Sequence, residues 1–206
     1  MAVAEFFTTP DEWLWWEREV LADVAGPVLD LGCGAGRHSL HLQSRGLAVT
    51  AVDHSPGAVE VCRSRGVSDV RLADLVDPPD DKAWGTVLLL CGNLGLAGGW
   101  DSTRRLLSRL AQICAPDARV VADTVDPTVT DDPDRLADLE RRRKLGEPIA
   151  VYRLRLRYRD LVTPWWDLLT VPRADMARLV QGTGWSIERH LEDGADHVVV
   201  LRPTPR

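Results

Sequence analysis

The segment V-L-D-L-G-C-G-A-G, residues 28–36, constrains the fold more than any other part of the sequence. A short apolar strand ends there, and Gly32, Gly34 and Gly36 allow a sharp turn into a helix. Glycine adopts backbone conformations that other residues avoid and has no side chain, so backbone amides can approach a ligand closely. Amides at the start of a helix also attract polar or anionic groups. The segment therefore predicts a nucleotide-type binding turn in an α/β protein.

Apolar strands and helices alternate along the rest of the chain. Further strands are predicted over residues 47–52, 67–73, 86–90 and 118–122, with helices over 37–45, 56–65 and 101–114. Continuous apolar strands between helices are typical of a parallel sheet covered on both faces. Strands over 185–190 and 197–201, joined by E-D-G-A-D, predict an antiparallel last strand. We expect a Rossmann-like, doubly wound, mostly parallel seven-stranded sheet.

Two segments are predicted to lie outside this sheet. The start T-T-P-D-E predicts a helix over about residues 10–24, and residues 1–26 are expected to form a helical lid. Residues 127–171 are predicted to be an insertion with a loop and helix over 127–145. A strand over 151–158 is expected to pair with residues 163–171 in a hairpin, beside a helix over 175–181. A length of 206 residues suits one domain, residues 1–206.

Composition excludes several classes of protein. The formal charge is -6 with both signs intermixed, so no wide positive field favours a nucleic-acid partner. The four cysteines form no C-x-x-C pair, and we expect neither a metal site nor a disulfide framework. No signal-like start and no long apolar span is present, which predicts a soluble, cytoplasmic protein without a membrane partner. The sequence indicates no oligomeric state.

A second feature of a nucleoside site is Asp53, which ends the second strand. An acid at this place can accept hydrogen bonds from both hydroxyls of a ribose. Enzymes that bind dinucleotides use G-x-G-x-x-G, whereas the third glycine here comes one position earlier and Asp30 precedes the turn. An NAD(P)-dependent oxidoreductase is therefore the less favoured alternative.

Three segments together resemble a known family. D-L-G-C-G-A-G, A-V-D-H-S and R-L-A-D-L look like the first, second and third cofactor motifs of class I S-adenosylmethionine-dependent methyltransferases. The resemblance covers residues 27–122 and the terminal strand pair. The compact core and the R-H-S after the turn are most similar to small bacterial enzymes acting on metabolites or natural products. The resemblance implies S-adenosylmethionine as cofactor and S-adenosylhomocysteine as product.

The resemblance also implies roles for the residues of the first two motifs. Asp30 and the backbone of Gly32, Cys33 and Gly34 would surround the methionine part of the cofactor. Asp53 would bind the ribose.

The later motifs complete the implied cofactor site. His54 would lie against the adenine face, and Asp74 with the backbone of Leu75 would bind the adenine edge. Cys91, Gly92 and Asn93, after the fourth strand, would line the wall near the sulfonium.

An acceptor pocket is less clearly marked. Trp13, Trp16 and Trp166 are candidates because indoles offer large contact areas and a polar N–H group, but core packing explains them equally. Asn93 and His38 are further candidates. His38 has the chemistry of a base, although packing is the more favoured role.

Two departures from the family bear on its activity. Residues 84–86 are W-G-T where many members have an acid, which leaves open a cofactor-binding protein without transferase activity. C-G-N-L-G replaces the N-P-P-Y type of box, which argues against methylation of nucleic-acid bases. We expect in-line methyl transfer to an O, N, S or carbon atom of a small organic acceptor. Positioning and exclusion of water can supply much of the acceleration, so no catalytic base is assigned.

Overall fold

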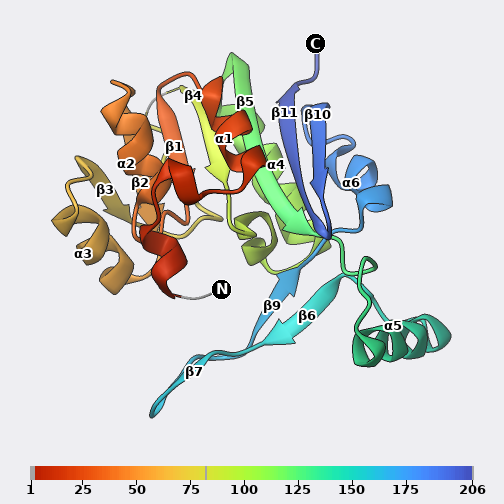
Figure 1. The fold of residues 1–206 in the computed structure, drawn as a ribbon. Helices are drawn as coiled ribbons and strands as arrows, with labels where there is room; N and C mark the ends of the chain where they lie inside the picture. Colours follow the sequence, from red (N-terminus) through yellow and green to blue (C-terminus); the bar gives the residue numbers. More distant parts are fainter. Residues whose placement is uncertain (1–2, 82, 206) are drawn as a thin grey trace.

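A seven-stranded sheet forms the centre of the computed structural model, which describes residues 3–81 and 83–205 (Figure 1). Its strands are β1 (Val28–Leu31), β2 (Val49–Asp53), β3 (Asp69–Leu72), β4 (Trp84–Leu89), β5 (Cys114–Val125), β10 (Trp185–Asp193) and β11 (Asp196–Pro203). Their order is β10-β11-β5-β4-β1-β2-β3. Strands β1 to β5 are parallel, and β11 is antiparallel to both of its neighbours. The predicted fold class is confirmed.

Helices cover both faces of the sheet. They are α1 (Trp15–Ala22), α2 (Arg37–Ser44), α3 (Pro56–Ser64), α4 (Trp100–Ile113) and α6 (Arg173–Val180). Helices α4 and α6 bury their apolar sides against one face, and α1 and α2 bury theirs against the other. Helix α3 closes a third, smaller core beside β2 and β3. No helix in the described part of the chain is long and apolar enough to cross a bilayer.

The central strands follow the predicted pattern because they are covered on both sides. Every residue of β1 and β2 is buried, as continuous apolar runs require. Strand β4 begins two residues before the predicted start, since the fully buried Trp84 belongs to it and donates from its indole nitrogen to Pro79 O at 2.8 Å. Strand β5 is longer than predicted because it pairs with both β4 and β11.

The predicted single helix over residues 10–24 is wrong at its start. Short 3-10 helices η1 (Val3–Phe7) and η2 (Pro10–Glu12) precede α1, and the chain is extended at Trp13 and Leu14, with ψ of 157° and 149°. Carboxylates stabilise both sides of this break. Glu12 accepts from Thr9 N at 2.9 Å, and Glu17 accepts from Leu14 N at 3.0 Å. The Glu17 bond satisfies an amide that an uninterrupted helix would have bonded internally, and the Glu12 bond caps the start of η2.

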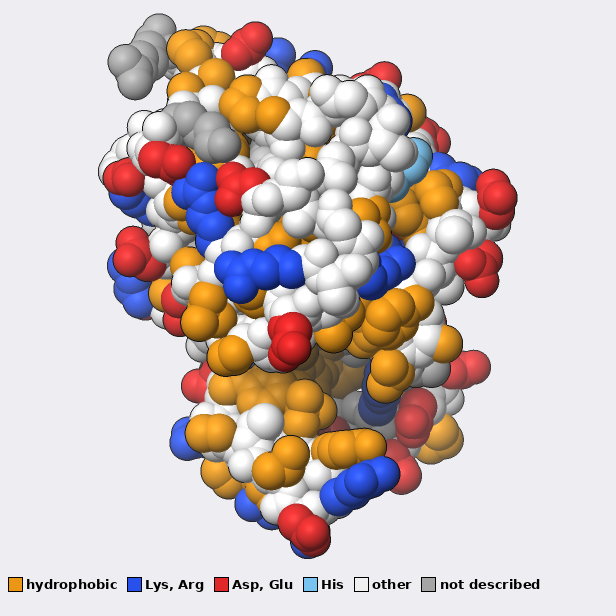
Figure 2. Space-filling model, turned by 90° about the vertical axis from the view of Figure 1, so that its left-hand side faces the viewer, with side chains coloured by type: hydrophobic (Ala, Val, Ile, Leu, Met, Phe, Trp, Pro, Cys, Tyr) orange, Lys and Arg blue, Asp and Glu red, His pale blue; other side chains and the backbone are white. Residues whose placement is uncertain are grey.

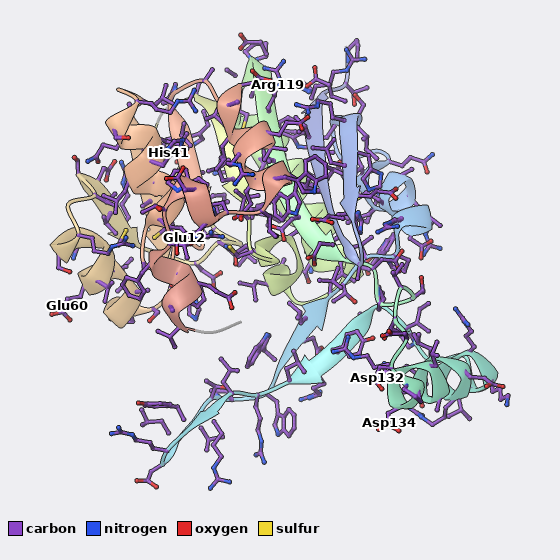
Figure 3. All side chains as sticks on the ribbon, in the orientation of Figure 1. Glu12, His41, Glu60, Arg119, Asp132 and Asp134 are labelled. Carbon is purple, nitrogen blue, oxygen red and sulfur yellow. The ribbon has the colours of Figure 1, made fainter. Side chains whose placement is uncertain are left out.

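The predicted insertion contains a helix and two short antiparallel ladders. These elements are α5 (Pro133–Leu145), β6 (Val151–Leu154), β7 (Arg157–Tyr158), β8 (Leu161–Val162) and β9 (Trp166–Leu169). Strand β6 pairs with β9 and β7 with β8, so the predicted hairpin is confirmed, although the strand expected over residues 151–158 is interrupted after Leu154. Residues 151–169, here called the arm, project away from the sheet (Figures 1 and 3). Helix α5, which Asp132 caps, also lies away from the sheet (Figure 3).

The base of the arm packs closely on η3 (Asn93–Ala97), a 3-10 helix that the sequence did not predict. A side chain at Gly95 would overlap the carbonyl oxygen of Leu169 in β9. Glycine is therefore required at position 95 because of this close contact. Its φ angle does not lie in the left-handed region that favours glycine.

Gly95→Ala should lower the free energy of unfolding by about 1–3 kcal/mol, the usual cost of forcing extra atoms into a packed site. Gly57→Ala is the matched control. Gly57 lies in the first turn of α3, and a Cβ there meets only Ser55 Oγ, at 3.9 Å. Alanine's helix propensity should leave that variant unchanged or up to about 1 kcal/mol more stable. Urea unfolding checks both; equal stability of the two variants would contradict the proposed backbone contact.

Candidate active site

The glycine turn joins β1 to α2 at the carboxyl ends of the parallel strands. Gly32, Gly34 and Gly36 have φ of +79°, +55° and +76°, in the left-handed region that disfavours other residues. Packing adds a second requirement. A Cβ at Gly32 would overlap the side-chain amide of Asn93, and one at Gly36 would lie 2.6 Å from Cys62 Sγ. The sequence motif thus reflects both backbone conformation and close approach.

Asp53 and β2 hold one side of the turn. Val52 O accepts from Gly32 N and Cys33 N at 2.8 and 3.0 Å. Asp53 is buried at the end of β2, and its two carboxylate oxygens accept from Gly34 N and Ser55 N, each at 2.9 Å. Each oxygen retains acceptor capacity because a carboxylate has about four lone-pair sites.

Asn93 holds the other side of the turn. It is buried at the start of η3, and its Nδ2 donates to Leu31 O and Gly32 O, each at 2.9 Å. This amide therefore ties the loop after β4 to the loop after β1. Adjacent parallel strands bring their carboxyl ends together, and ligands of open α/β sheets bind at that edge.

A cavity of about 130 Å³ lies between these two loops. It is lined by Phe6, Asp30, Gly32, Cys33, Gly34, Arg37, His38, Leu90, Cys91 and Asn93. Ligand pockets usually measure about 300–1,000 Å³, so the cavity is small for a nucleoside cofactor. The ring of Phe6 lies against the turn, 3.4 Å from where a Cβ of Gly34 would be. The N-terminal segment thus contributes a wall to the cavity.

Asp30 is a buried carboxyl group at one wall of this cavity. Burial raises its pKa, because the low-dielectric surroundings disfavour the charged form. Ser39 Oγ donates to its Oδ2 at 2.5 Å, and the nearby His38 counteracts the effect of burial in part. Asp30 is therefore a buried acceptor held in place by the first turn of α2.

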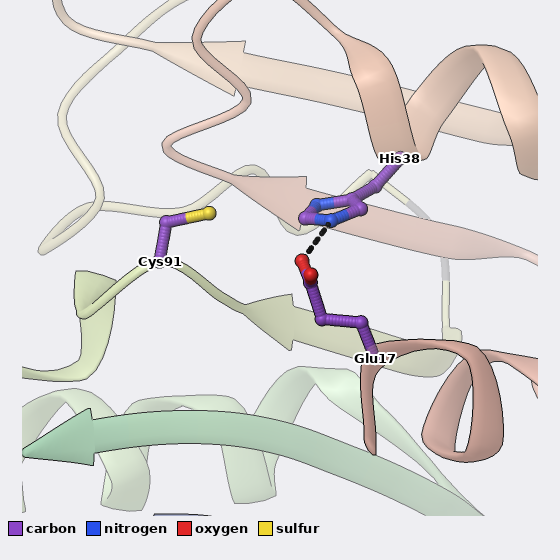
Figure 4. A group of neighbouring side chains, drawn as sticks. All are labelled: Glu17, His38 and Cys91. Atoms are coloured by element: carbon purple, nitrogen blue, oxygen red, sulfur yellow. Dashed lines mark hydrogen bonds and ion pairs between the residues drawn. The ribbon is translucent and has the colours of Figure 1, made fainter. Parts of the chain in front are cut away.

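Glu17, Arg37, His38 and Cys91 meet beside the cavity. Figure 4 shows three of them, Glu17, His38 and Cys91. Glu17 Oε1 lies 3.0 Å from His38 Nε2 and also pairs with Arg37 Nη2. Burial alone raises the pKa of Glu17, but the hydrogen bond with His38 and the charge of Arg37 outweigh it, so the net pKa is lowered. Glu17 is therefore a buried carboxylate at neutral pH.

The same group has the spacing of a metal site. Among the described residues, the possible ligand atoms of Glu17, His38 and Cys91 lie within 4.8 Å of one another. However, Arg37 Nη2 pairs with Glu17 and lies 3.3 Å from Cys91 Sγ. A guanidinium thus already supplies the positive charge that this carboxylate requires, and the absence of a metal stays a prediction.

Asp123 is a further buried acid behind the wall of the site. It lies in β5 and accepts from Gly92 N at 3.1 and 3.2 Å. Burial raises the pKa of Asp123 to about 7, despite this hydrogen bond. The carboxyl group therefore changes charge near neutral pH.

The ionisation of Asp123 should make stability fall as pH rises. Its pKa is about 7 in the folded chain and roughly 3.9 when unfolded, so the folded state binds its proton more tightly. The resulting stabilisation is complete below about pH 4 and is lost as pH rises to about 7. The native chain should lose about 2–3 kcal/mol of unfolding free energy as pH rises from 5 to 8, and Asp123→Asn should not, because asparagine does not ionise. Urea unfolding at each pH measures the difference. The exposed Asp131→Asn is the control, and parallel pH profiles of all three proteins would refute the assignment.

The predicted adenine-binding residues lie at the ends of β2 and β3, away from the cavity. His54 is exposed, with its Nδ1 3.7 Å from Asp53 Oδ1. Asp74 is also exposed and accepts from Val76 N at 3.1 Å, whereas Leu75 is buried in the main core. Neither His54 nor Asp74 lines the cavity around the glycine turn, and their contact with adenine remains a prediction.

The predicted pocket tryptophans also lie outside the cavity lining. Trp13 and Trp16 are buried in the core beneath α1, and the Trp13 ring meets His38 edge-on at 4.9 Å. Trp166 is half-buried on β9 at the base of the arm. The indole nitrogens of Trp16 and Trp166 have no hydrogen-bond partner among the described residues.

Sequence reasoning did not find Glu17, Arg37 or Asp123, whereas Phe6 belongs to the group of N-terminal aromatic residues that the sequence offers as a possible cap of the cofactor. Glu17 matches the pattern of an acid near a helix start, and nothing in the sequence indicates that it faces α2. Arg37 and His38 follow the glycine turn directly, which is the one sequence signal for this cluster. Gly85, where family members have an acid, has a packing cause: a Cβ there would lie 2.8 Å from Gly26 O.

Comparisons with known proteins agree with this geometry. The sequence profile of a methyltransferase domain family matches residues 28–117, which include the glycine turn, Asp53 and Asn93. The crystal structure of an S-adenosylmethionine-dependent methyltransferase from Bacteroides fragilis, in complex with S-adenosyl-L-homocysteine, has a TM-score of 0.83 and 26% identity. The similarity covers 100% of this chain and 83% of that one.

Two curated sequences are similar over a shorter region. A demethylmenaquinone methyltransferase of Clavibacter sepedonicus is 35% identical over 107 residues, and an uncharacterized methyltransferase of Mycobacterium bovis is 32% identical over 103 residues. Each match covers 49% of this chain, and the chain spans only 42% and 40% of those two proteins. The chain thus spans less than half the length of these two relatives.

The fold, the glycine turn and these similarities define the class of protein. Residues 28–117 match a methyltransferase domain family, and the chain as a whole is similar to an S-adenosylmethionine-dependent methyltransferase. These similarities favour methyl transfer over the alternative of a nicotinamide-dependent oxidoreductase.

Proposed function

We propose that this chain transfers a methyl group from S-adenosylmethionine to a small organic acceptor by in-line displacement, releasing S-adenosylhomocysteine. The observation that carries the proposal is the turn of left-handed glycines, held open between Asp53 and Asn93 beside a cavity. The relative from Bacteroides fragilis was solved with S-adenosyl-L-homocysteine bound.

In this proposal, the cofactor lies along the carboxyl ends of β1, β2 and β4. The free backbone surface of the turn and Asp30 bind the methionine part, and Asp53 binds the ribose with its remaining lone pairs. His54, Asp74 and Leu75 bind the adenine. Cys91 and Asn93 form the wall near the sulfonium. Phe6 closes the cavity, which is small for S-adenosylmethionine. The N-terminal segment therefore acts as a lid that moves to admit the cofactor.

The acceptor is proposed to bind between the sheet and the arm. Figure 2 shows a hollow between the body and the arm, where hydrophobic side chains gather. The indole nitrogen of Trp166, at the base of the arm, is buried and has no hydrogen-bond partner among the described residues. It would donate to such a ligand once the ligand displaces the atoms that cover it. Specificity for the acceptor would then lie in residues 1–26 and 127–171, which are the lid and the insertion of a single methyltransferase domain over residues 1–206.

The setting proposed for this activity is the cytoplasm of a bacterium, with neither nucleic acid nor a membrane as partner. The intermixed charges and the net charge of -6 favour small acceptors over an anionic polymer. The close approach of Gly26 O to Gly85 leaves no room for a side chain at this position of the W-G-T segment. The departure from the family pattern in this segment therefore has a packing cause and does not favour a protein without transferase activity.

Asp53→Ala should weaken binding of S-adenosylhomocysteine by about 1.5–3 kcal/mol, the scale of hydrogen bonds to a charged group. Isothermal titration calorimetry measures the affinity, and circular dichroism checks the fold. Glu60→Ala, on the exposed side of α3 (Figure 3), is the control and should bind normally. Native affinity in a folded Asp53→Ala protein would remove Asp53 from the ribose site.

Trp166→Ala should impair transfer to the acceptor while changing S-adenosylhomocysteine affinity by less than about tenfold, because the arm is proposed to contact only the acceptor. Trp165→Ala is the matched control, since Trp165 is 53% exposed and stacks on Arg155. Transfer of labelled methyl groups to a panel of phenols, amines and thiols gives the rates. A loss of cofactor affinity with unchanged acceptor rates would place Trp166 in the cofactor site instead.

A further inference from the structure

Glu17 and His38 form a buried carboxylate–imidazole pair. Glu17 is 3% exposed on α1, and His38 is 5% exposed in the first turn of α2, with Oε1 and Nε2 3.0 Å apart (Figure 4). Trp13 packs edge-on against the imidazole, so the ring is fixed by packing as well as by the hydrogen bond. The two residues come from separate helices, and only the docking of α1 brings them together.

The surroundings of Glu17 determine which nitrogen of His38 carries hydrogen. Arg37 and Leu14 N both donate to the Glu17 carboxylate, and the lowered pKa of Glu17 keeps it ionised. An ionised carboxylate only accepts hydrogen bonds, so His38 Nε2 must be the donor. In the neutral imidazole, the lone pair then lies on Nδ1. No hydrogen bond to that atom occurs among the described residues.

The position of His38 allows this lone pair to act on a ligand bound in the cavity. His38 lines the same cavity as Asp30, the glycine turn and Cys91. A base must reach the proton that it removes, and a buried carboxylate behind an imidazole both orients the ring and stabilises its protonated form. His41 is a useful contrast, because it also touches the Trp13 ring but does not line the cavity.

We propose that His38 is the general base for methyl transfer to a protic acceptor, an O–H or N–H group, and that Glu17 is its positioning residue. The inference rests on the proposed function. His38 Nδ1 takes the acceptor's proton, and the electron pair of that bond becomes available to the acceptor atom. S-adenosylmethionine supplies the methyl group to that atom, its carbon–sulfur bond breaking to leave neutral S-adenosylhomocysteine. The imidazolium is stabilised by Glu17 and returns its proton to solvent.

The charges around His38 set the expected pH dependence. Glu17 faces it from α1, Asp30 from β1, Arg37 and His41 from α2, and Cys91 follows β4. The base acts in its neutral form, so the rate should rise with pH. Removing the Glu17 carboxylate destabilises the imidazolium, and the rising limb of the profile should therefore move to lower pH in Glu17→Gln.

The first measurement concerns the tautomer and needs no acceptor. Nitrogen–proton NMR of the imidazoles in the full chain, free and with S-adenosylhomocysteine, should show His38 protonated at Nε2 with an unprotonated Nδ1. His38→Gln identifies the resonances, and His41→Gln is the control. Protonation at Nδ1 in the neutral ring would overturn the proposal even if the acceptor panel yielded no turnover.

The second measurement uses acceptors of graded acidity. Ring-substituted phenols of rising acidity, benzylamine and thiophenol are offered with labelled S-adenosylmethionine. His38→Gln should slow transfer to the least acidic phenol by on the order of 10²–10⁴, the usual contribution of a general base. The loss should shrink as the phenol becomes more acidic and should be small for the largely ionised thiophenol. His41→Gln should match the native chain throughout.

Calorimetry with S-adenosylhomocysteine tests the role of His38 and the proposed function separately. Native-like affinity with an equal loss of rate on every acceptor would show that His38 only packs, and would leave the proposed function standing. Failure of the native chain to bind S-adenosylhomocysteine would instead contradict the proposed function. If Glu17→Gln slows the reaction but leaves the rising limb of the pH–rate profile in place, the role of Glu17 as the positioning residue of His38 is contradicted.

Discussion

The amide side chain of Asn93 is the contact on which the geometry of the site depends. It bonds two carbonyls at the end of β1 and fills the space that a side chain at Gly32 would take. Asp53 bonds the next part of the turn from β2. Three neighbouring strands thus fix one loop through two side chains. The sheet provides the rigidity, and these two residues transfer it to a turn that has no regular structure of its own.

A second layer of contacts joins this loop to the N-terminal helix. The carboxylate of Glu17 binds Arg37 and His38 just beyond the turn, and also the amide of Leu14 at the start of its own helix. The buried carboxylate of Glu17 therefore caps the start of α1 and also holds this helix against α2. A buried carboxylate with several donors tolerates few changes, because removing a donor leaves its charge uncompensated. The N-terminal segment is consequently part of the cavity wall.

The sheet and the insertion were predictable from local patterns, whereas the contacts between helices were not. Continuous apolar runs and glycine positions give the order of strands and turns, and the cofactor motifs give Asp53 and Asn93. The break before α1 escaped prediction because a side chain, that of Glu17, caps the new helix start at Leu14 within an otherwise helical pattern. The partnership of Glu17 with His38 depends on how α1 packs, which no local spacing encodes.

The base of the arm packs tightly on the rest of the protein where β9 meets Gly95 of η3. Beyond it, Tyr158 and Leu161 in the short ladder at the tip are largely exposed. Substitutions or added residues at the tip therefore alter few buried contacts and cost little folding free energy. In an enzyme lineage that must acquire new acceptors, such a tip is a region in which sequence can change rapidly while the cofactor-binding sheet stays the same.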